Sequence, residues 1–541
     1  MPKLSFQTTS PADVRADVVA LPIFEGPEPG PGVKEAGRKL GADLLDLYRS
    51  NKLRGRAGEA LVVPTLGKLP ATSLLLVGLG KRDEVDADAL RRGIGKAAGR
   101  LARFAKVATT ISQAAPGDRD RAVQATVEGL LLGSYRFDRY KGKGTDPRDT
   151  QRPLAEIIVL GDGRSDGAAK QTLERAQIIS ECVAWARDLV NTPALDATPD
   201  YLAKEARRMA REAGLQVKVW TEAELKRGGF GGIIGVGRGS VNPPRLIELT
   251  YKEAGTARPY AITGKGVTFD SGGLSLKPAN AMEWMNADMA GAAAALAAMR
   301  GIGLLKPKLN VIAAIPCSEN LPSGSSIRPG DVLHHRGGKT SEVLNTDAEG
   351  RLILADALAY LVEKKPVAVI DCATLTGAAV VALGEGISAV MGNDPELIRQ
   401  VLDAAHETGE PAWELPLWQP YRKLIDSTLA DVKNTGPRFA GSITAGLFLR
   451  EFVGDTPWVH MDVAGTAYSD NGPGDYWPKG ATGVPTRTLI QFALDRAGQG
   501  RRTPRASGNG QRTGAKKSTA RRSTGRTTAK KSAAKRSTTR R

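Results

Sequence analysis

The segment Tyr260-Ala-Ile-Thr-Gly-Lys-Gly-Val-Thr-Phe-Asp-Ser-Gly-Gly273 is the clearest indication of the fold of the larger part of the chain. It opens with a short continuous apolar run, and similar runs follow at residues 309–316 and 367–373. Runs without polar alternation are typical of strands that are buried on both faces of a sheet. Three segments with helical apolar spacing lie between or after them: 281–301, 351–363 and 395–408. This pattern predicts an α/β domain over residues 191–497, with a mixed sheet flanked by helices.

The first 165 residues carry a second pattern, in which short β-branched runs alternate with amphipathic segments. The predicted strands are 16–24, 60–66, 73–79, 107–111 and 156–160, and the predicted helices are 33–53, 87–104 and 119–135. Such alternation favours a mostly parallel sheet covered by helices. No acids, histidines or nucleophile gather here, so we expect a smaller, non-catalytic N-terminal α/β domain over residues 1–165. A helix within residues 166–190 is expected to connect the two domains.

The charge of the chain is concentrated at its C-terminal end. The 541 residues include 76 basic and 58 acidic side chains, a formal net charge of +18. Residues 501–541 hold fifteen of the basic side chains and no acid, which leaves 61 against 58 in residues 1–500. Residues 501–541 contain no Val, Ile, Leu, Met, Phe, Trp, Tyr or Cys. The tail therefore cannot bury enough apolar surface to offset the conformational entropy that ordering would cost. We therefore predict a nearly neutral globular body and a disordered basic tail over residues 498–541.

Cysteine and apolar content indicate a cytoplasmic protein. The three cysteines, Cys182, Cys317 and Cys372, are widely spaced in apolar surroundings, which is typical of small core residues rather than of disulfides or a zinc site. The N-terminus has no apolar signal segment. The longest strongly apolar stretch that we find, residues 372–384, is shorter than the roughly 20 residues of a membrane span.

Lys265 interrupts an apolar strand between two glycines, and Asp270 closes the same strand. A lysine in a buried run is costly unless it is paired or neutral. The alternative is an edge-strand lysine that reaches solvent along its aliphatic stem. A phosphate loop is disfavoured, because the Gly-Lys-Gly sequence lacks the spacing of that motif.

Two further segments place acids where chains enter helices. Asp288 lies among small apolar residues, where it could also be an acid that complements the dipole of a helix. The octapeptide Asn345-Thr-Asp-Ala-Glu-Gly-Arg-Leu352 opens a helical pattern, and Thr346 or Asp347 could simply cap that helix. However, two acids and an arginine at a strand-to-helix junction also suit the crevice in which α/β sheets bind ligands.

Together these segments predict a metal site. Its members are Lys265, Asp270, Asp288, Asp347 and Glu349. Four converging carboxylates repel one another unless cations neutralise them, and two divalent ions about 3.5–4 Å apart suit such a cluster. A nearby cation would also lower the pKa of the lysine, which must be neutral to act as a ligand. Lys277 and Arg351 remain as cations that can stabilise an oxyanion.

At this point the sequence resembles the leucyl (cytosol) aminopeptidase family of two-metal exopeptidases. The octapeptide Asn345-Thr-Asp-Ala-Glu-Gly-Arg-Leu352 matches the family signature throughout. Further matches follow in the right order at residues 264–273, 277–278, 288–289 and 479–483. The resemblance covers residues 1–497 and is strongest from Asn191 onward.

The resemblance implies a role for each site residue. Lys265, Asp270, Asp288, Asp347 and Glu349 would bind two divalent ions, Mn or Zn, with Asp270 and Glu349 bridging both. Lys277 would be catalytic, and Arg351 would hold a bicarbonate that acts as general base. Met285, Thr374, Gly377 and Ala464 would line the pocket for the N-terminal side chain. The substrates would be short peptides with a free N-terminus, cleaved preferentially after leucine-like residues, and the assembly would be a homohexamer. Three positions near the site depart from the family pattern and bear on side-chain preference: Asn286, Ala290 and Ala467.

Two other functions compete with this interpretation. The fifteen positive charges of residues 501–541 predict non-specific DNA or RNA binding through phosphate contacts, and a solubilising extension is the alternative. The tail has no aromatic side chain that could stack on bases. The glycine run at residues 228–239 suggests a nucleotide loop only weakly, because it does not contain the dinucleotide fingerprint.

Overall fold

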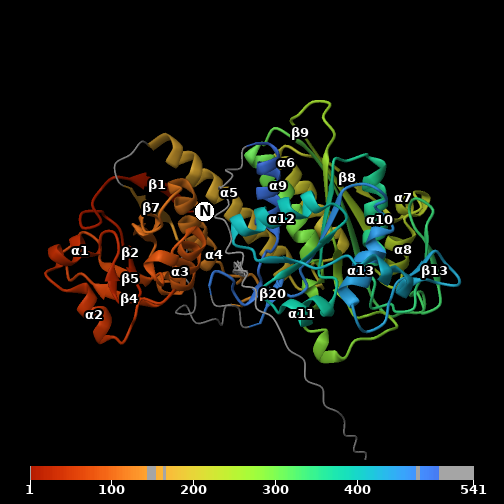
Figure 1. The fold of residues 1–541 in the computed structure, drawn as a ribbon, viewed down its shortest axis with the longest axis horizontal. Coiled ribbons are helices and arrows are strands. Elements are labelled where there is room, and N and C mark those ends of the chain that lie inside the picture. Colours follow the sequence, from red (N-terminus) through yellow and green to blue (C-terminus); the bar gives the residue numbers. More distant parts are fainter. Residues whose placement is uncertain (1, 143–153, 162–165, 471–474, 499–541) are drawn as a thin grey trace, which may run out of the picture. The chain divides into compact units, whose positions relative to one another are not determined.

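A computed structural model describes residues 2–142, 154–161, 166–470 and 475–498 (Figure 1). The basic tail, predicted to be disordered, lies outside the described residues from position 499 onward. Within the described residues the chain forms two separate large sheets, each covered by helices. The expectation of an α/β fold with a smaller N-terminal and a larger C-terminal sheet is confirmed.

The N-terminal sheet has the strand order β1-β7-β6-β2-β5-β4. Its strands are β1 Lys3–Gln7, β2 Val18–Phe24, β4 Ala60–Pro64, β5 Ser73–Gly78, β6 Lys106–Thr109 and β7 Glu156–Leu160, and the short β3 Glu28–Pro29 pairs with β2. All neighbours along the order are parallel except β4 and β5. The five predicted strands are confirmed. Strand β1 was not predicted from the sequence, because it is a short edge strand that is only partly buried.

The helices of this half follow the predicted segments with one break. They are α1 Val33–Leu40, α2 Leu44–Ser50, α3 Ala87–Ala97 and α4 Arg119–Gly133. A single helix over residues 33–53 was wrong, because Gly41 adopts a left-handed conformation with φ 69° and ends α1. The Asp43 side chain then accepts from the N–H groups of Leu45 and Asp46, which starts α2. The connecting helix α5 spans Asp166–Asn191.

The larger sheet is mixed, with the order β17-β16-β19-β15-β10-β12-β9-β8. Its strands are β8 Gln216–Trp220, β9 Arg245–Lys252, β10 Tyr260–Gly264, β11 Gly266–Asp270, β12 Asn310–Asn320, β15 Val369–Ala373, β16 Ser388–Gly392, β17 Ala412–Glu414 and β19 Trp458–Asp462. The central strands β19, β15, β10 and β12 are mutually parallel, and β11 extends the sheet by pairing with the end of β12. Parallel strands end at one edge, which is where the predicted site residues lie.

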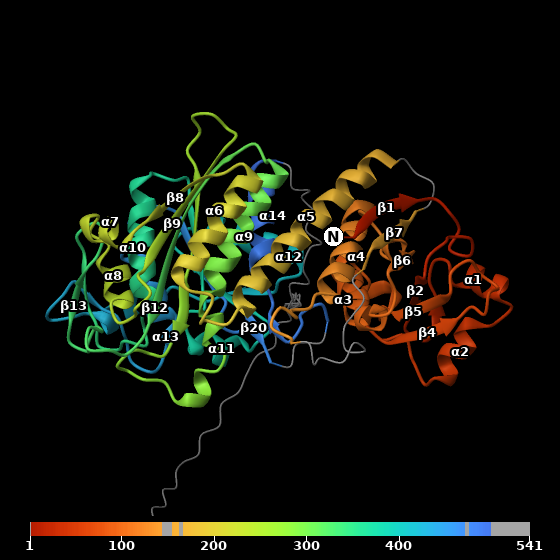
Figure 2. The ribbon, with the colours of Figure 1, turned by 180° about the vertical axis from the view of Figure 1, so that it is seen from behind.

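Helices cover both faces of this sheet (Figures 1 and 2). One core contains residues of α5, α6 Pro199–Ala213, α9 Ala290–Leu305, α12 Pro395–Thr408 and α14 Thr486–Arg496. The opposite core contains residues of α7 Glu222–Arg227, α8 Gly231–Gly237, α10 Gly350–Glu363 and α13 Gly441–Arg450. The remaining elements are α11 Gly377–Leu383, the small sheet β13 Val332–His334, β14 Thr340–Glu342 and β18 Val432–Lys433, and the hairpin β20 Tyr468–Ser469 and β21 Gly480–Ala481.

Helix α9 differs from its prediction in two ways. The predicted helix at residues 281–301 begins instead at Ala290, after a 3₁₀ turn at Met285–Met289. The segment Met285–Leu305 is long and apolar enough to cross a membrane by length and composition, which corrects the prediction that residues 372–384 are the longest strongly apolar stretch. However, 83% of its most apolar window is buried inside the protein, as expected of a core helix. Gly291 permits this packing, because a Cβ there would lie 2.1 Å from the carbonyl oxygen of Cys372 on β15.

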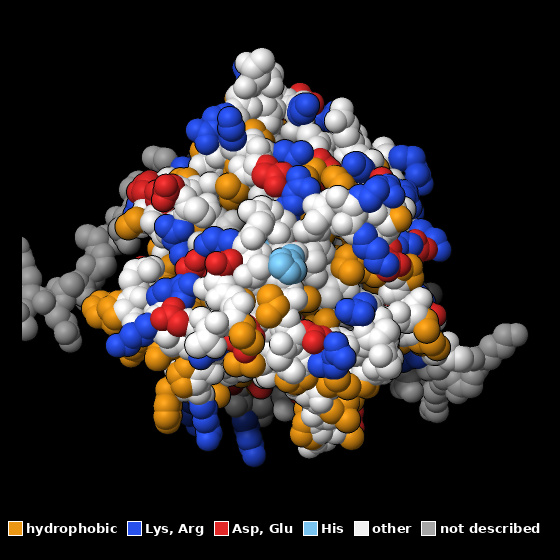
Figure 3. All heavy atoms as spheres, turned by 90° about the vertical axis from the view of Figure 1, so that its right-hand side faces the viewer, with side chains coloured by type: hydrophobic (Ala, Val, Ile, Leu, Met, Phe, Trp, Pro, Cys, Tyr) orange, Lys and Arg blue, Asp and Glu red, His pale blue; other side chains and the backbone are white. Residues whose placement is uncertain are grey.

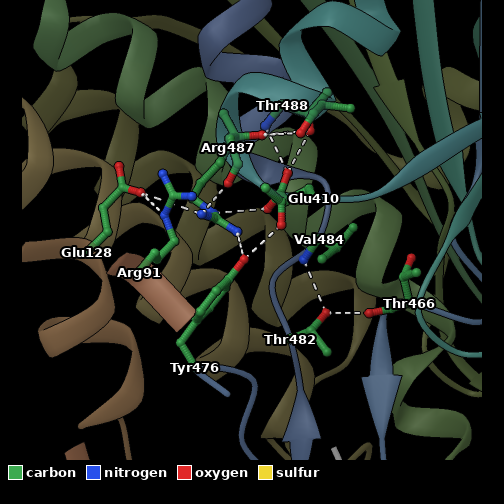
Figure 4. A network of polar contacts seen from close by, with 12 residues as sticks. Arg91, Glu128, Glu410, Thr466, Tyr476, Thr482, Val484, Arg487 and Thr488 are labelled. Carbon is green, nitrogen blue, oxygen red and sulfur yellow. Dashed lines mark hydrogen bonds and ion pairs between the residues drawn. The ribbon is translucent and has the colours of Figure 1, made fainter. Parts of the chain in front are cut away.

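Buried charges join the two halves of the chain (Figure 4). Arg487 of α14 lies 3.5 Å from Glu128 of α4 and 3.3 Å from Glu410, which follows α12. Arg91 of α3 pairs with the same Glu128 carboxylate at 2.8 Å. Arg487 also donates to the hydroxyl of Tyr476 at 2.9 Å. These side chains are almost completely buried, so each depends on its partners to offset the loss of water.

The glycine run and the three cysteines both lie in packed parts around the larger sheet. The glycine run at residues 228–239 forms α8, and a Cβ on Gly232 would lie 2.1 Å from the carbonyl oxygen of Leu352. These glycines therefore allow α8 to approach α10 closely, which gives them a packing role. The three cysteines are free and buried, as predicted.

Candidate metal centre

Lys265 lies between β10 and β11, in the middle of the larger sheet. Its N–H donates to the carbonyl oxygen of Cys372 at 3.0 Å, and the residue is only 4% exposed. The alternative of an edge-strand lysine that reaches solvent is therefore wrong. Its side chain passes over Gly350 at the start of α10, where a Cβ would lie 2.5 Å from Cε of Lys265.

Three of the predicted acids form a cluster at the carboxyl edge of the sheet. Asp270 ends β11, and Asp347 and Glu349 lie in the loop that leads from β14 into α10. Each of the three offers a carboxylate oxygen, and these oxygens all lie within 4.8 Å of one another. Such a spacing is close enough for shared coordination of a cation.

Two lysines lie among these acids. The ammonium nitrogen of Lys265 is 2.8 Å from Glu349 Oε1 and 2.8 Å from Asp288 Oδ2. That of Lys277 is 2.7 Å from Asp270 Oδ2, and it also pairs with Asp347. The structure thus brings the five predicted ligands and Lys277 into one continuous set of contacts.

The pKa values within this set reflect burial and charge. Burial alone would lower the pKa of Lys265, but the carboxylates of Asp288 and Glu349 outweigh it and raise that pKa. The pKa of Lys277 is raised in the same way, by Asp270 and Glu349. Burial and the neighbouring acids raise the pKa of Asp288 and Glu349 despite the adjacent lysines. A divalent cation at the same carboxylates would favour their charged forms and a neutral Lys265.

The donor set fits a divalent metal ion. Among the described residues, Glu349 Oε2 is buried and accepts no hydrogen bond. A buried carboxylate oxygen of this kind is costly unless something electropositive meets it. The carboxylates of Asp270, Asp288, Asp347 and Glu349, with the amine of Lys265, provide the oxygen-rich ligands that Mn, Mg and Zn ions use.

Residues 345–349, the part of the octapeptide that precedes α10 and is called the signature loop below, are held by hydrogen bonds rather than by helix capping. Glu349 occupies the cap position of α10 without a side-chain hydrogen bond, so capping by Thr346 or Asp347 was wrong. Thr346 Oγ1 instead donates to the carbonyl oxygen of Gly272 at 2.6 Å and accepts from the N–H of Ser275 at 2.8 Å. These bonds fasten the loop carrying Asp347 to the loop carrying Lys277.

Two buried asparagines that the sequence did not reveal also contact these loops. Asn320, at the end of β12, donates to Asp270 Oδ1 at 2.8 Å and to the carbonyl oxygen of Thr346 at 2.9 Å. The side-chain amide of Asn434 accepts from the N–H of Leu344 and donates to the carbonyl oxygen of Asn345. The only signal for Asn320 is its place at the end of a long apolar run, and Asn434 has none.

Arg351 lies at the border of the metal centre. Its Nη1 donates to the carbonyl oxygen of Asn434 at 2.9 Å, whereas its buried Nε has no hydrogen-bond partner among the described residues. Burial lowers the pKa of Arg351 to about 10, so the side chain remains charged at neutral pH. A cation with an unused donor is suited to hold a small anion.

The predicted pocket residues lie around Asp288 and the end of β15. Thr374 follows β15, and its hydroxyl donates to Asp288 Oδ1 at 2.8 Å. Met285 begins the 3₁₀ turn that contains Asp288. Gly377 begins α11, and Ala464 donates its N–H to Asp462 Oδ1 at 3.2 Å. The same Asp462 oxygen accepts from the N–H of Leu375, so it links the segments of Thr374 and Ala464; the sequence did not indicate Asp462.

The chain is an α/β protein, and the carboxylates and lysines at the carboxyl edge of its mixed sheet form a candidate divalent-metal centre. The model of the cytosol aminopeptidase family catalytic domain matches residues 184–490, and that of the N-terminal domain of the same family matches residues 20–144. The chain belongs to the cytosol aminopeptidase family, and it is a metal-dependent hydrolase of the aminopeptidase class.

Relatives with assigned names agree with this placement. A probable cytosol aminopeptidase of Syntrophotalea carbinolica is 46% identical over 486 residues, covering 88% of this chain and 97% of the relative. One of Streptomyces avermitilis is 43% identical, with 91% and 98% covered. Among solved structures, the bottromycin maturation enzyme BotP in complex with Mn is 35% identical with a TM-score of 0.79, covering 89% of this chain and all of that one. A tomato leucine aminopeptidase mutant is 29% identical with a TM-score of 0.82, covering 92% and 97%.

Proposed function

We propose that this aminopeptidase releases leucine-like residues from the free N-terminus of short peptides, with two divalent ions at the carboxylate cluster. The observation that carries the proposal is the convergence of Asp270, Asp347 and Glu349 within 4.8 Å, beside Lys265 and Asp288. These five side chains would hold the ions. When bound, divalent ions polarise a carbonyl and lower the pKa of water to near neutrality.

The protein's own cations have distinct roles in this proposal. The acids around Lys277 keep its pKa raised, so its ammonium group stays charged and can stabilise negative charge on the scissile carbonyl oxygen. Arg351 would hold a bicarbonate ion, which accepts the proton of the attacking water. The unpartnered Nε of Arg351 supports this role. Both residues serve hydrolysis without becoming part of a covalent intermediate.

Met285, Thr374, Gly377 and Ala464 would receive the side chain of the N-terminal residue. The hydrogen bond from Thr374 to Asp288 supports a pocket next to the proposed metal ligands. Gly377 and Ala464 add little bulk, which suits a branched aliphatic side chain. A leucine-like preference is therefore proposed, and Ala467 and Asn286 are the nearby positions expected to tune it.

Further parts of the proposal concern organisation. We infer domains at residues 1–165 and 191–497 with a connecting helix over 166–190, supported by the two separate sheets. The relatives' names favour a cytoplasmic location. A homohexamer is part of the proposal, and large apolar side chains exposed on the catalytic half are available for contacts between copies: Leu274, Leu276, Trp284, Val381, Trp413, Trp418, Leu429 and Phe439. Figure 3 shows apolar side chains gathered at the lower edge of one face.

The test is hydrolysis of leucine p-nitroanilide by the purified protein with Mn or Zn ions. Asp347→Ala and Lys265→Ala are each expected to lower kcat/KM by at least 100-fold, on the order of what loss of an essential group costs. Asp403→Ala, which removes an exposed acid of α12, is the matched control and should keep full activity. Full activity in Asp347→Ala or Lys265→Ala would refute the site assignment.

A second function is favoured by the composition of the tail. Fifteen basic residues without an acid would bind DNA or RNA phosphates through counterion release. The body is nearly neutral, and on the face in Figure 3 its Lys and Arg side chains are interspersed with Asp and Glu. The tail is therefore the part of the chain proposed to contact nucleic acid.

This second function is tested by comparing the full chain with a chain that ends at Gln499. Fluorescence anisotropy with duplex DNA should give weaker binding for the shortened chain and a shallower dependence on salt. Peptidase activity should be equal in both. Equal DNA affinity in both would remove the tail from nucleic-acid binding.

A further inference from the structure

Asn434 is a buried asparagine whose side chain lies against the signature loop. It directly follows β18, which pairs with β14 in parallel register, Ser341 with Val432 and Glu342 with Lys433. Its own N–H continues that ladder by donating to the carbonyl oxygen of Glu342 at 2.9 Å. The backbone of Asn434 is thereby fixed at the point where β14 leads into the loop of metal ligands.

The amide group of Asn434 is fully engaged by this loop. Its Oδ1 accepts from the N–H of Leu344 at 2.9 Å and from the N–H of Asn345 at 3.3 Å. Its Nδ2 donates to the carbonyl oxygens of Asn345 at 2.6 Å and Ala348 at 3.3 Å. A carboxamide offers two donors and two acceptor lone pairs, so its whole capacity is used here.

The same residue also holds Arg351. The carbonyl oxygen of Asn434 accepts from Nη1 of Arg351, the one hydrogen bond that this side chain makes among the described residues. Asn434 therefore contacts both ends of the segment that runs from Leu344 to Arg351. Asp347 and Glu349 lie within this segment, so a shift of the loop would move both ligands and Arg351 together.

We propose that Asn434 is a positioning residue that fixes Asp347, Glu349 and Arg351 in the geometry that the metal ions and the substrate require. The proposal rests on the proposed two-metal function. Side chains that orient metal ligands typically change metal affinity or activity by 10–100-fold when removed. Within the part of the chain that the structure describes, Asn434 makes no hydrogen bond to the cluster oxygens or to Lys277, so it acts through the loop backbone.

The matched control is Asn393, a second asparagine of the same half. Its Oδ1 accepts from the N–H of Trp458 at 2.7 Å, and its Nδ2 donates to the carbonyl oxygen of Thr456 at 2.9 Å. It therefore bridges backbone groups as Asn434 does, but it does so between β16 and β19, away from the signature loop. Asn393→Ala reports the cost of losing a structural asparagine.

The experiment compares the wild-type chain with Asn434→Ala, Asn434→Ser and Asn393→Ala after removal of metal by chelation. Mn²⁺ affinity is measured by titration calorimetry, and hydrogen exchange is measured for the amides of Leu344 and Asn345. Asn434→Ala should weaken Mn²⁺ binding by about 10–100-fold and speed exchange of both amides. Asn434→Ser, whose hydroxyl replaces part of the bonding, should lie between Asn434→Ala and wild type.

Asn393→Ala should lower the melting temperature but keep Mn²⁺ affinity and the exchange of these two amides unchanged. The proposal is overturned if Asn434→Ala matches Asn393→Ala in Mn²⁺ affinity and in the exchange of the Leu344 and Asn345 amides. Where the alanine variant does not fold, the same comparison is made with Asn434→Ser. Failure of the proposed function is a separate result. In that case wild-type protein itself would bind no Mn²⁺, while hydrogen exchange still reports whether Asn434 holds the loop.

Discussion

The ammonium nitrogen of Lys265 lies 2.8 Å from Oε1 of Glu349, and both side chains are buried at the centre of the catalytic half. Gly350, the residue that follows Glu349, lies against the lysine side chain and leaves room for it, because it has no Cβ. The Lys265 amine can therefore approach the Glu349 carboxylate because position 350 of the octapeptide has no Cβ.

Gly350→Ala should displace Lys265. The added Cβ would lie 2.5 Å from Cε and 2.8 Å from Nζ of Lys265, and α10 itself would accept alanine well. We expect kcat/KM for leucine p-nitroanilide and Mn²⁺ affinity each to fall about 10–100-fold, with circular dichroism unchanged. Gly324→Ala is the control, because a Cβ there has no neighbour within 4 Å. Unchanged kinetics in Gly350→Ala would show that Lys265 is not held where the metal centre needs it.

Removal of metal should destabilise the protein. Four carboxylates that share one buried centre repel one another, so a cation bound only by the folded chain adds to its stability. Mn²⁺ at 100 times its Kd should raise the free energy of unfolding of chelator-treated protein by about 2.7 kcal/mol. Urea unfolding with and without Mn²⁺ measures this, and Asp347→Ala should gain less. An equal gain in that variant would place the stabilising ion elsewhere.

Arg487 should be required for stability. It lies against Glu128, Glu410 and Tyr476, all buried, so Arg487→Met would leave buried acids with fewer partners. Loss of one partner of a buried ion pair costs about 3–5 kcal/mol. Arg399→Met on the exposed face of α12 also removes an arginine with two acidic partners, and it should lower the free energy of unfolding far less, because water screens these exposed pairs. Urea unfolding of both variants decides the matter, and equal losses would mean that the buried network adds nothing.

His460 should make stability depend on pH. It lies 2.5 Å from Asp371 on the neighbouring strand, and both are buried. Burial lowers the pKa of His460, but the Asp371 carboxylate outweighs burial and raises it above the ordinary value of 6.5. A raised pKa in the folded state contributes stability that is complete below about pH 6.5 and is lost as pH rises through the folded-state pKa.

The measurement for His460 is urea unfolding across pH 5.5–9, a range of about one to two units on each side of the histidine value. The stability advantage of wild type over His460→Gln should shrink as pH rises. Asn393→Ala, which removes no titratable group, is the control, and its effect on stability should not depend on pH in this way. An advantage that grows with pH would contradict the raised pKa.

Apolar periodicity in the sequence predicted several of the large elements, although it did not indicate α6, α13 and α14 or the strands β8, β9, β16 and β19. Segments with strong helical spacing became α4, α10 and α12 with nearly the expected bounds, and each continuous apolar run became a strand. The errors fall where local chemistry overrides periodicity. Gly41 ends a helix that periodicity would continue, and the small residues before Ala290 form a 3₁₀ turn instead of the first turns of α9.

The metal centre could be predicted because charged side chains interrupt apolar runs. Lys265 and Asp270 stand out for that reason. Asp288, Asp347 and Glu349 stand out because they lie where the chain enters helices, and the resemblance to a family assigned a role to each of the five. Asn434 could not be found this way. Its partner Asn345 is 89 residues away in the sequence, and a neutral amide in a polar segment carries no sign of its contacts. Residues that position a site through backbone hydrogen bonds become visible only once the chain is folded.

The buried network around Arg487 also has a consequence for the order of events during synthesis. The N-terminal part of a chain leaves the ribosome first, and domains generally begin to fold as they emerge. Glu128 can meet Arg91 early, because both belong to the N-terminal sheet's helices. Arg487, in contrast, lies on the last described helix, so the site where it joins Glu128 and Glu410 stays incomplete until almost the whole body has been translated. A ribosome that stalls before α14 would therefore release a chain with a loosely closed junction between its two halves, which proteases can attack.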